Sequence, residues 1–488
     1  MSTSGAADAA TRLQRDAVGL APVLFQSITH MAPAAAVAFS IIFAVTYAGG
    51  ATPLAVLLAL VACLFVAISI GQLAKHLPSA GGLYTYSARG LHPTVGFFVA
   101  WGFMLAEPLV APLLYLIFGN VISAYLNAHF GTPTWLWAPL AALAGIGVWV
   151  LVYRGVRIST ETGVALGAFE IVVFLALGIT LIFAAGSNNT LSVFNPSTGN
   201  SSGLGSVFAG MVYTVLAFIG FEASAPLGEE AKDPKRTIPR AVILSCVLIG
   251  VFYLICYYGA IVYFGPDKAA DPKNGFFFFN GGDPWDGLAS AVWGPFAILV
   301  LLAIVNSAFA NSNAGANAAT RVGYSLARAG ILPRALAKVH PRFKTPYVAV
   351  HVQGALGIAL ALVLGLALGG PLLAFALLGT VATLVIVCIY ILTNLANIVF
   401  YMREHRDELN VVWNVIVPVL GILIFIPVLV ASFGIDFFGL GIVALAPPAS
   451  YAPWVVVAWL VIGVVLYFYL QSQSPAAIKE TATTFSEA

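Results

Sequence analysis

The sequence predicts an all-α membrane protein with twelve membrane-spanning helices. Of its 488 residues, 60% are hydrophobic and only 8% are charged, whereas an ordinary soluble protein carries about 25% charged residues. The apolar residues form runs of about 20, the length that a helix needs to cross the hydrocarbon core of a bilayer. Polar or Gly/Pro-rich breaks separate these runs, so we expect one membrane domain rather than several soluble ones.

The expected spans follow one another along the chain. They cover residues 20–48, 53–74, 94–127, 134–153, 158–185, 204–227, 238–264, 287–319, 347–367, 371–400, 412–432 and 452–471. The basic residues orient them: with the N-terminus inside, all of the 21 Lys and Arg residues except Lys268 and Lys273 fall on the inner side. Because positive charge is retained in the cytoplasm, both ends of the chain are expected there.

Two of the expected spans are interrupted at matching places, each at the start of a block of five. The first contains "THMAPAAA", with His30 and Pro33 in mid-span, and the sixth contains "FIGFEASAP", with Gly220 and Glu222. Proline removes a backbone donor and glycine weakens a helix, so both segments expose backbone groups that protein or water must satisfy. Such a pair indicates an inverted-repeat transporter with its site near the membrane midplane. A simple kink would explain Pro33, but not the carboxylate beside the second break.

This pattern divides the chain into a core and three further parts. The expected transporter core is residues 20–400, with repeat one at 20–185 and repeat two at 204–400; helices 11 and 12 follow at 412–471, and the cytoplasmic tails are 1–19 and 472–488.

Three acidic residues, Glu107, Glu170 and Glu222, fall well inside expected spans. A charged residue at the centre of a membrane helix costs about 2.5–3.5 kcal/mol, so such residues usually face a cavity, pair with a partner or titrate. No Lys or Arg lies in mid-span to neutralise them. A proton or a cationic substrate is therefore the expected counter-charge.

Three longer motifs resemble those of the amino acid, polyamine and organocation transporter superfamily. They are "GQLAKHLPSAGGLYTYSARGLHPTVGFFVAW" (71–101), "GFEASAPLGEEAKDPKRTIPRA" (220–241) and "NAATRVGYSLARAGILPRALAKVHPRFKTP" (317–346). Within it, the stretches at 94–98 and 104–112 look most like bacterial putrescine importers. The resemblance implies a LeuT-like fold of five plus five inverted helices and two C-terminal helices, with helices 1 and 6 broken.

The resemblance also implies where substrate binds. The expected contacts are His30, Met31, Ala32, Pro33, Ala34 and Ala35 in the first break, Glu107 on the third helix, and Phe218, Gly220, Phe221 and Glu222 around the second break. Putrescine importers have an acidic residue at the position of Glu107, which makes it the expected ammonium ligand. The turn at 31–34 departs from the Gly-Ser-Gly turn of many amino acid permeases, whose amides approach a substrate carboxylate.

Several of these residues have a second interpretation. Glu107 could instead hydrogen-bond to local hydroxyls or to backbone freed by Pro108, and His30 could be an ordinary satisfied donor. Glu170 aligns with a fifth-helix position where several proton-coupled members carry a lysine, so we expect it to carry the coupling proton; alternatively it is a protonated acid that merely packs. Asn306, Asn311, Asn313 and Asn317 stripe the eighth helix, where helix packing through amides is the favoured role.

We therefore expect a secondary transporter of the bacterial cytoplasmic membrane that imports amino acids or organic amines by proton symport through alternating access. An exchanger is the alternative within this class, and an ion channel, prompted by "TVGFF" at 94–98, is the alternative outside it. No motif of an enzyme or of nucleotide binding occurs, and the seven histidines do not fall at ligand spacing, so no enzyme, cofactor or metal site is expected.

A proton rather than sodium is the expected coupling ion. The expected partners are a small amino acid or amine and the bilayer, without nucleic acid, for a monomer or weak dimer.

Overall fold

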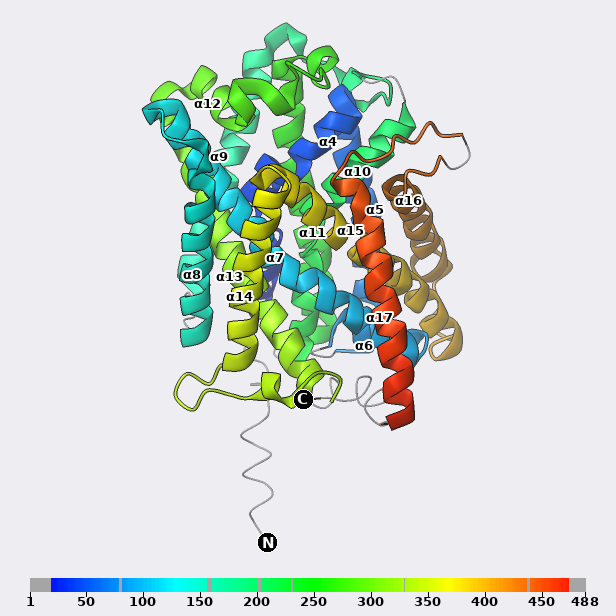
Figure 1. The fold of residues 1–488 in the computed structure, drawn as a ribbon. Coiled ribbons are helices and arrows are strands. Elements are labelled where there is room, and N and C mark those ends of the chain that lie inside the picture. The colour runs from blue at the N-terminus through cyan, green and yellow to red at the C-terminus, as the bar shows by residue number, and fades with distance from the viewer. Residues whose placement is uncertain are drawn as a thin grey trace.

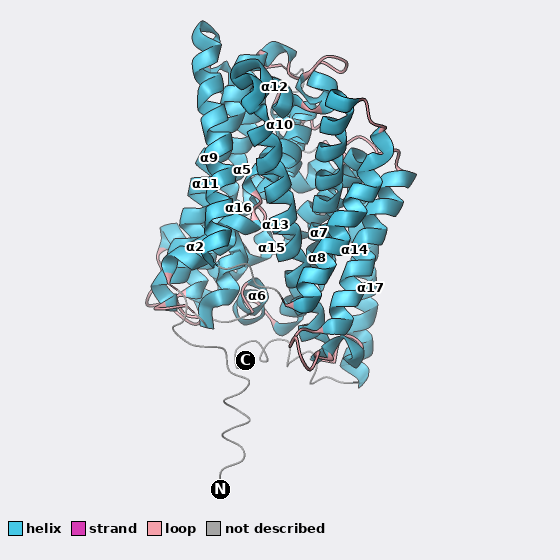
Figure 2. Cartoon of the chain, turned by 90° about the vertical axis from the view of Figure 1, so that its left-hand side faces the viewer, coloured by secondary structure: helices cyan, strands magenta, loops and turns pink. Residues whose placement is uncertain are grey.

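The computed structural model is a bundle of helices that run between two opposite ends (Figure 1). It describes residues 19–78, 81–155, 160–199, 203–229, 231–328, 330–436 and 439–473. Across these ranges the chain forms helices, turns and loops without a β-strand (Figure 2). The predicted all-helical membrane protein is confirmed. Apart from residues 19, 472 and 473, the two expected tails lie outside the described ranges.

The helices agree closely with the expected spans. The N-terminal part of the chain contains α2 (Leu20–His30), α3 (Pro33–Ala35), the π-helical turn η1 (Ala36–Ser40), α4 (Ile41–Ala48), α5 (Thr52–Ala74), α6 (Leu83–Gly90), α7 (Pro93–Phe130), α8 (Trp137–Arg154) and α9 (Thr160–Ala185). The rest contains α10 (Leu204–Phe218), the 3₁₀ segment η6 (Phe221–Glu229), α11 (Pro234–Phe264), η8 (Phe276–Gly282), α12 (Pro284–Trp293), α13 (Ile298–Arg328), α14 (Tyr347–Ala367), α15 (Pro371–Arg403), η11 (Val412–Ile416), α16 (Val417–Ser432) and α17 (Ala452–Gln473).

Ten apolar helical runs in the described part of the chain are long enough to cross a membrane, or eleven if α10 and residues 221–228, bent by 42°, form one span. The count takes Leu20–Ala74 as a single run. Gly49, at φ 57° and ψ −131°, nevertheless ends α4 before α5 begins. The number of spans therefore depends on how this run is divided.

One expected span differs from the structure. The sequence predicted a continuous helix at 287–319, whereas the short helix α12 ends at Trp293 and α13 begins only at Ile298. Gly294 has a positive φ of 55°, and Pro295 supplies no backbone donor, so the helix cannot continue through this point. In Figure 1, α12 lies at one end of the bundle and α6, which the sequence analysis did not predict, at the other, which we call the α6 end.

The long helix α7 holds the bundle together. It packs against α8, α13 and α15, and α17 is attached to it by a pair of tryptophans. The rings of Trp101 and Trp459 stack with centroids 4.4 Å apart. Each indole N–H donates to the other residue's backbone carbonyl at 2.9 Å. The large exposed side chains of α16 and α17, such as Leu423 and Trp454, fit a surface in contact with lipid tails.

Candidate functional site

A cavity of about 70 Å³ lies beside the two broken helices. Its wall comes from the first broken helix, α7, the end of α10, α13 and α15. The lining residues are His30, Ala32, Ala35, Ala36, Ser40, Ala106, Glu107, Val110, Leu113, Leu114, Ile117, Leu216, Ile219, Asn311, Phe375, Ala382 and Ile386. Sites for drug-sized ligands usually have volumes of about 300–1,000 Å³, so the walls must separate before a larger substrate fits.

The first break is held open by its own backbone. Ala32 adopts left-handed angles, φ 47° and ψ 64°, a conformation that costs an L-residue about 1–2 kcal/mol. Pro33 follows it and has no N–H. The next helical half therefore begins with the amides of Ala34 and Ala35, which have no partner within the helix itself.

Side chains from other helices satisfy these freed groups. The Ala34 amide donates to Glu170 Oε2 at 3.2 Å, and the Ala35 amide donates to Ser307 Oγ at 3.2 Å. On the other side of the break, Asn311 Nδ2 donates to the carbonyl of His30 at 3.0 Å. The first break is thus supported by α9 and α13, which lie far from it in the sequence.

The second break combines a carboxylate of its own with side chains from other helices. Gly220, at φ 117°, donates its amide to Oε2 of Glu222 at 3.0 Å, and the Tyr390 hydroxyl donates to the same oxygen at 2.9 Å. Ser27 links this segment to the first helix: its hydroxyl donates to the carbonyl of Phe221 at 2.7 Å and accepts from the Ser224 amide at 3.1 Å.

The two breaks touch each other at Gly220. A Cβ at this position would lie 2.8 Å from the carbonyl carbon of His30 and 2.8 Å from its Cδ2 atom. Real side chains do not approach so closely, so glycine is required both by its φ angle and by this contact. The cavity therefore lies beside a crossing of two interrupted helices.

Two buried oxygens on the cavity wall have no hydrogen-bond partner among the described residues. They are Oε2 of Glu107 and Oδ1 of Asn311. Neither Lys nor Arg is among the residues that line this cavity. A buried acceptor without a donor loses the free energy of hydration, about 1–3 kcal/mol, and more for a charged group. The wall therefore offers acceptor oxygens to a small ligand that donates hydrogen bonds.

The structure brings four of the expected contact residues to this cavity: His30, Ala32, Ala35 and Glu107. The other expected residues are not among those that line the cavity. They are Met31, Pro33, Ala34, Phe218, Gly220, Phe221 and Glu222. The ring of Phe218 packs edge-on against Tyr253, and that of Phe221 packs against Tyr390. Glu170 lies outside the wall too, at the amide of Ala34.

The sequence analysis did not predict that Phe375 lines the cavity, and it favoured a helix-packing role for the asparagines of the eighth helix, including Asn311. Phe375 lines the cavity, and its ring stacks on Phe43 with centroids 5.7 Å apart; Phe43 in turn stacks on Tyr213 at 5.3 Å. Nothing local in "LLAFALLG" distinguishes Phe375 from a lipid-facing residue. Asn311 belongs to the expected stripe of asparagines, but only the structure shows that its carbonyl oxygen has no partner.

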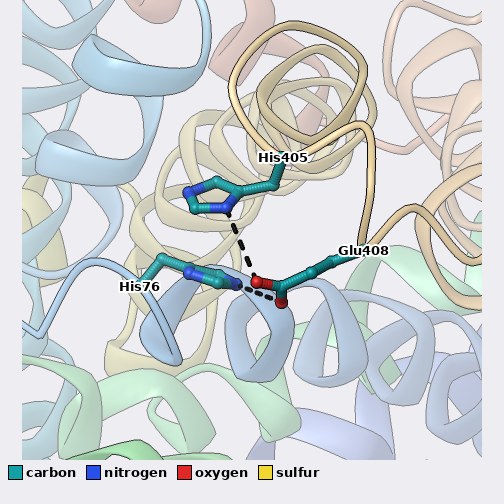
Figure 3. Close-up of side chains that lie close together, drawn as sticks. All are labelled: His76, His405 and Glu408. Atoms are coloured by element: carbon teal, nitrogen blue, oxygen red, sulfur yellow. Dashed lines mark ion pairs between the residues drawn. The ribbon is translucent and has the colours of Figure 1, made fainter.

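A second polar cluster lies at the α6 end. His76, His405 and Glu408 offer ligand atoms that lie within 4.8 Å of one another (Figure 3). Burial lowers the pKa of His76, and His405 and Lys235 lower it further, against the opposite effect of Glu408. The sequence analysis expected no metal site because the histidine spacing is not that of a local motif. This group forms only when distant segments meet.

Comparison with known proteins gives a consistent result. The family model described as amino acid permease matches residues 23–467. The chain is 26% identical to the low-affinity putrescine importer PlaP of Escherichia coli (strain K12), over 81% of this chain and 83% of the relative. It is 25% identical to the branched-chain amino acid permease BcaP of Bacillus subtilis, over 86% of each chain, and 24% identical to the methylthioribose transporter of the same organism, over 87% of each.

Proposed function

Because the chain belongs to the amino acid permease family, whose relatives are transporters and not enzymes, we propose that it imports a small organic amine by proton symport. Membership supports a transporter of amino acids or amines in general. The choice of an amine depends on the cavity, and the choice of a proton depends on Glu170.

One observation carries the choice of an amine: Glu107 Oε2 and Asn311 Oδ1 are unpaired acceptors on one small cavity. An ammonium group has three N–H donors and a positive charge, so it can satisfy both oxygens and neutralise the carboxylate. Charge-assisted bonds of this kind are worth about 1.5–3 kcal/mol. A neutral or anionic ligand would leave the Glu107 charge uncompensated.

The first break supports the same choice. The carboxylate of an α-amino acid needs free amides, which the N-terminus of a half-helix normally supplies. Here the amides of Ala34 and Ala35 already donate to Glu170 and Ser307. A resident carboxylate therefore occupies the position where a substrate carboxylate would bind. A diamine, the kind of substrate named for one of the relatives, has no such requirement.

The proposed transport cycle uses twelve spans. We divide Leu20–Ala74 at Gly49 and count α10 with η6, which gives five plus five helices in inverted repeats, followed by α16 and α17. Both termini and the α6 end are then cytoplasmic, in the cytoplasmic membrane of a bacterium, as the distribution of basic residues favours. Alternating access would move helices 1, 2, 6 and 7 against helices 3, 4, 8 and 9.

Glu170 is the proposed proton carrier. It is buried, it contacts the first break from α9, and no Lys or Arg in the described spans pairs with it. A protonated carboxyl group cannot accept from the Ala34 amide as strongly as a carboxylate does. Loading and release of a proton would thus weaken and strengthen the contact between α9 and the first helix, which couples the proton to their relative motion.

Thermal unfolding of the purified protein with candidate ligands tests the proposed function. A ligand at 100 times its dissociation constant stabilises the folded state by about 2.7 kcal/mol. We expect diamines and monoamines to raise the unfolding midpoint and amino acids to raise it less. Stabilisation by amino acids alone would contradict the choice of an amine. Uptake at ion-channel rates without saturation would contradict a transporter, and exchange without accumulation driven by a pH gradient would favour an exchanger.

A further inference from the structure

Away from the cavity, three side chains with metal-ligating atoms meet at the α6 end (Figure 3). His76 lies just beyond the end of α5, while His405 and Glu408 lie in the connection between α15 and η11. The carboxylate of Glu408 points between the two imidazole rings, and the dashed lines in Figure 3 run to it from both. None of these residues takes part in the proposed transport cycle.

The distances between the ligand atoms suit a bound metal ion better than direct hydrogen bonds between the side chains. His76 Nε2 lies 3.3 Å from Oε2 of Glu408, yet this buried nitrogen makes no hydrogen bond within the described structure. His405 Nδ1 lies 3.8 Å from the other oxygen, Oε1. Two ligands bound at about 2.0–2.1 Å to a tetrahedral ion lie about 3.3–3.4 Å apart, so the first pair already has the required separation.

The remaining adjustment is small. The three ligand atoms lie within 4.8 Å of one another, so the pair that is furthest apart would have to approach by at most about 1.5 Å to reach tetrahedral geometry. Glu408 is the side chain that can move, because 54% of it is exposed. The two histidines are more constrained, since 17% of the His76 side chain and 29% of the His405 side chain are exposed.

Aromatic neighbours hold both imidazoles in place. The ring of His76 packs against Phe400 and Tyr401, with centroids 5.9 and 5.6 Å away, and the ring of His405 packs against Phe400 at 5.1 Å. The two imidazoles lie 3.9 Å apart, tilted by 32°. The hydroxyl of Tyr401 donates to the Gln72 carbonyl at 3.1 Å, which fixes α15 against α5. Such supporting contacts orient metal ligands in known sites.

We propose that His76, His405 and Glu408 form a binding site for a divalent transition-metal ion of the Zn²⁺ class. Two imidazole nitrogens and one carboxylate oxygen, with a fourth position open to water, are a common ligand set for Zn²⁺. Mg²⁺ and Ca²⁺ prefer oxygen ligands and are excluded by this set. The ion would connect the end of α5 to the connection after α15 and thereby stabilise their contact.

The surroundings limit the affinity. Lys75 and Lys235 lie close enough to His76 to influence it electrostatically, and their positive charges oppose a bound cation. Glu408 is also the one acidic ligand in the cluster. We therefore expect binding in the micromolar range rather than the tighter binding of a closed structural zinc site.

Calorimetric titration of Zn²⁺ into the full-length protein, with any affinity tag removed, tests the proposal. We expect one ion per chain, and a tenfold or greater loss of affinity in His76→Gln and in His405→Gln, because even supporting residues of metal sites change affinity by about 10- to 100-fold. Co²⁺ titration should give the absorption bands of a four-coordinate ion in the parent and not in these variants. Mg²⁺ and Ca²⁺ at the same concentrations should not compete.

Two further variants separate this site from general surface binding. His129→Gln removes a histidine at the far end of α7, which is not part of the cluster, and should leave Zn²⁺ affinity unchanged. Glu408→Gln changes a side chain that is 54% exposed, and it should abolish the rise in unfolding temperature that Zn²⁺ causes in the parent. Absence of a one-to-one site in the parent, or equal affinity in the His76→Gln/His405→Gln double variant, would overturn the proposal, whatever the transport substrate is.

Discussion

The two broken helices satisfy their freed backbone amides in different ways. At the first break, the freed amides of Ala34 and Ala35 donate to Glu170 and Ser307, which belong to other helices. At the second break, the freed amide of Gly220 donates to Glu222, two residues further along the same segment. Both carboxylates are buried. Glu170 belongs to a neighbouring helix, α9, whereas Glu222 belongs to the broken segment itself.

This difference indicates which contacts a conformational change can alter. The Glu222 carboxylate moves with its own break, so its contact with Gly220 survives when the helix shifts as a rigid body. The contact between Glu170 and Ala34 joins α9 to the first broken helix and must loosen if these two helices separate. We therefore expect Glu222 to contribute mainly to stability and Glu170 mainly to coupling.

Glu107 differs from both of these carboxylates. It lies on the continuous helix α7, whose interior includes Pro108 and Pro112, and one of its oxygens has no partner. Pro112 has no N–H to donate to the carbonyl of Pro108, and this carbonyl accepts instead from Gln353 Nε2 at 3.1 Å. Of the three carboxylates within the expected spans, Glu107 alone has an unpaired oxygen at the cavity within the described structure, which makes it the one available to substrate.

The largest expected effect comes from forcing the two breaks apart. In Gly220→Ala, the new Cβ would lie 2.8 Å from His30, at a φ of 117°. Backbone strain of about 1–3 kcal/mol and overpacking of about 1–3 kcal/mol should add to a loss of roughly 2–6 kcal/mol in the free energy of unfolding. Thermal unfolding in detergent measures this loss.

Gly369→Ala is the matched control. Gly369 also has a positive φ, of 85°, but a Cβ there meets no atom within 4 Å. Its loss should be confined to the strain, about 1–3 kcal/mol. Equal unfolding midpoints for the two variants would mean that the breaks do not depend on their contact.

A second prediction distinguishes the role of Glu170 from that of Glu222. Glu170→Gln cannot bind or release a proton, so it should abolish accumulation driven by a pH gradient in proteoliposomes while exchange of substrate across the membrane continues. Glu222→Gln should retain accumulation but lose about 1–2 kcal/mol of stability, because the bonds from Gly220 and Tyr390 become neutral ones. Normal accumulation in Glu170→Gln, or strict dependence on sodium in the parent, would refute proton coupling through this residue.

The smallest expected effect concerns a hydroxyl that joins the two broken helices. The Tyr253 hydroxyl lies 2.8 Å from the Ala217 carbonyl and 3.2 Å from the Met31 carbonyl. Tyr253→Phe should therefore lower the free energy of unfolding by about 0.5–1.5 kcal/mol. Tyr258→Phe, on the same helix but with its ring against Phe194, should change it less. An equal or larger loss in the control would show that the bonds of the Tyr253 hydroxyl to the breaks do not contribute to stability.

The sequence predicted the helices well because the length of an apolar run reports directly on a membrane span. Both breaks were predicted from Pro33 and Gly220, whose backbone chemistry is local. The interruption before α13 was missed, although Gly294 and Pro295 carry the same local signal, because the apolar run continues on both sides of it.

The partners of the polar residues were less predictable. Neither the amide that Glu170 caps nor the unpaired oxygen of Asn311 follows from spacing along the chain, since both depend on contacts between α9, α13 and the first helix. The meeting of His76 with His405 depends in the same way on α5 lying beside α15. Sequence patterns identify which residues are costly to bury, and the fold determines what they contact.

In the proposed site, Glu107 receives the ammonium group of the substrate. Equilibrium binding of a radiolabelled diamine to purified parent, Glu107→Gln and Glu222→Gln proteins tests it most directly. Loss of one charge-assisted bond of about 1.5–3 kcal/mol should weaken binding by about 10- to 100-fold in Glu107→Gln, while Glu222→Gln should bind within a few-fold of the parent. Unchanged affinity in Glu107→Gln, with the loss appearing in Glu222→Gln instead, would contradict the claim and transfer the ammonium site to the second break.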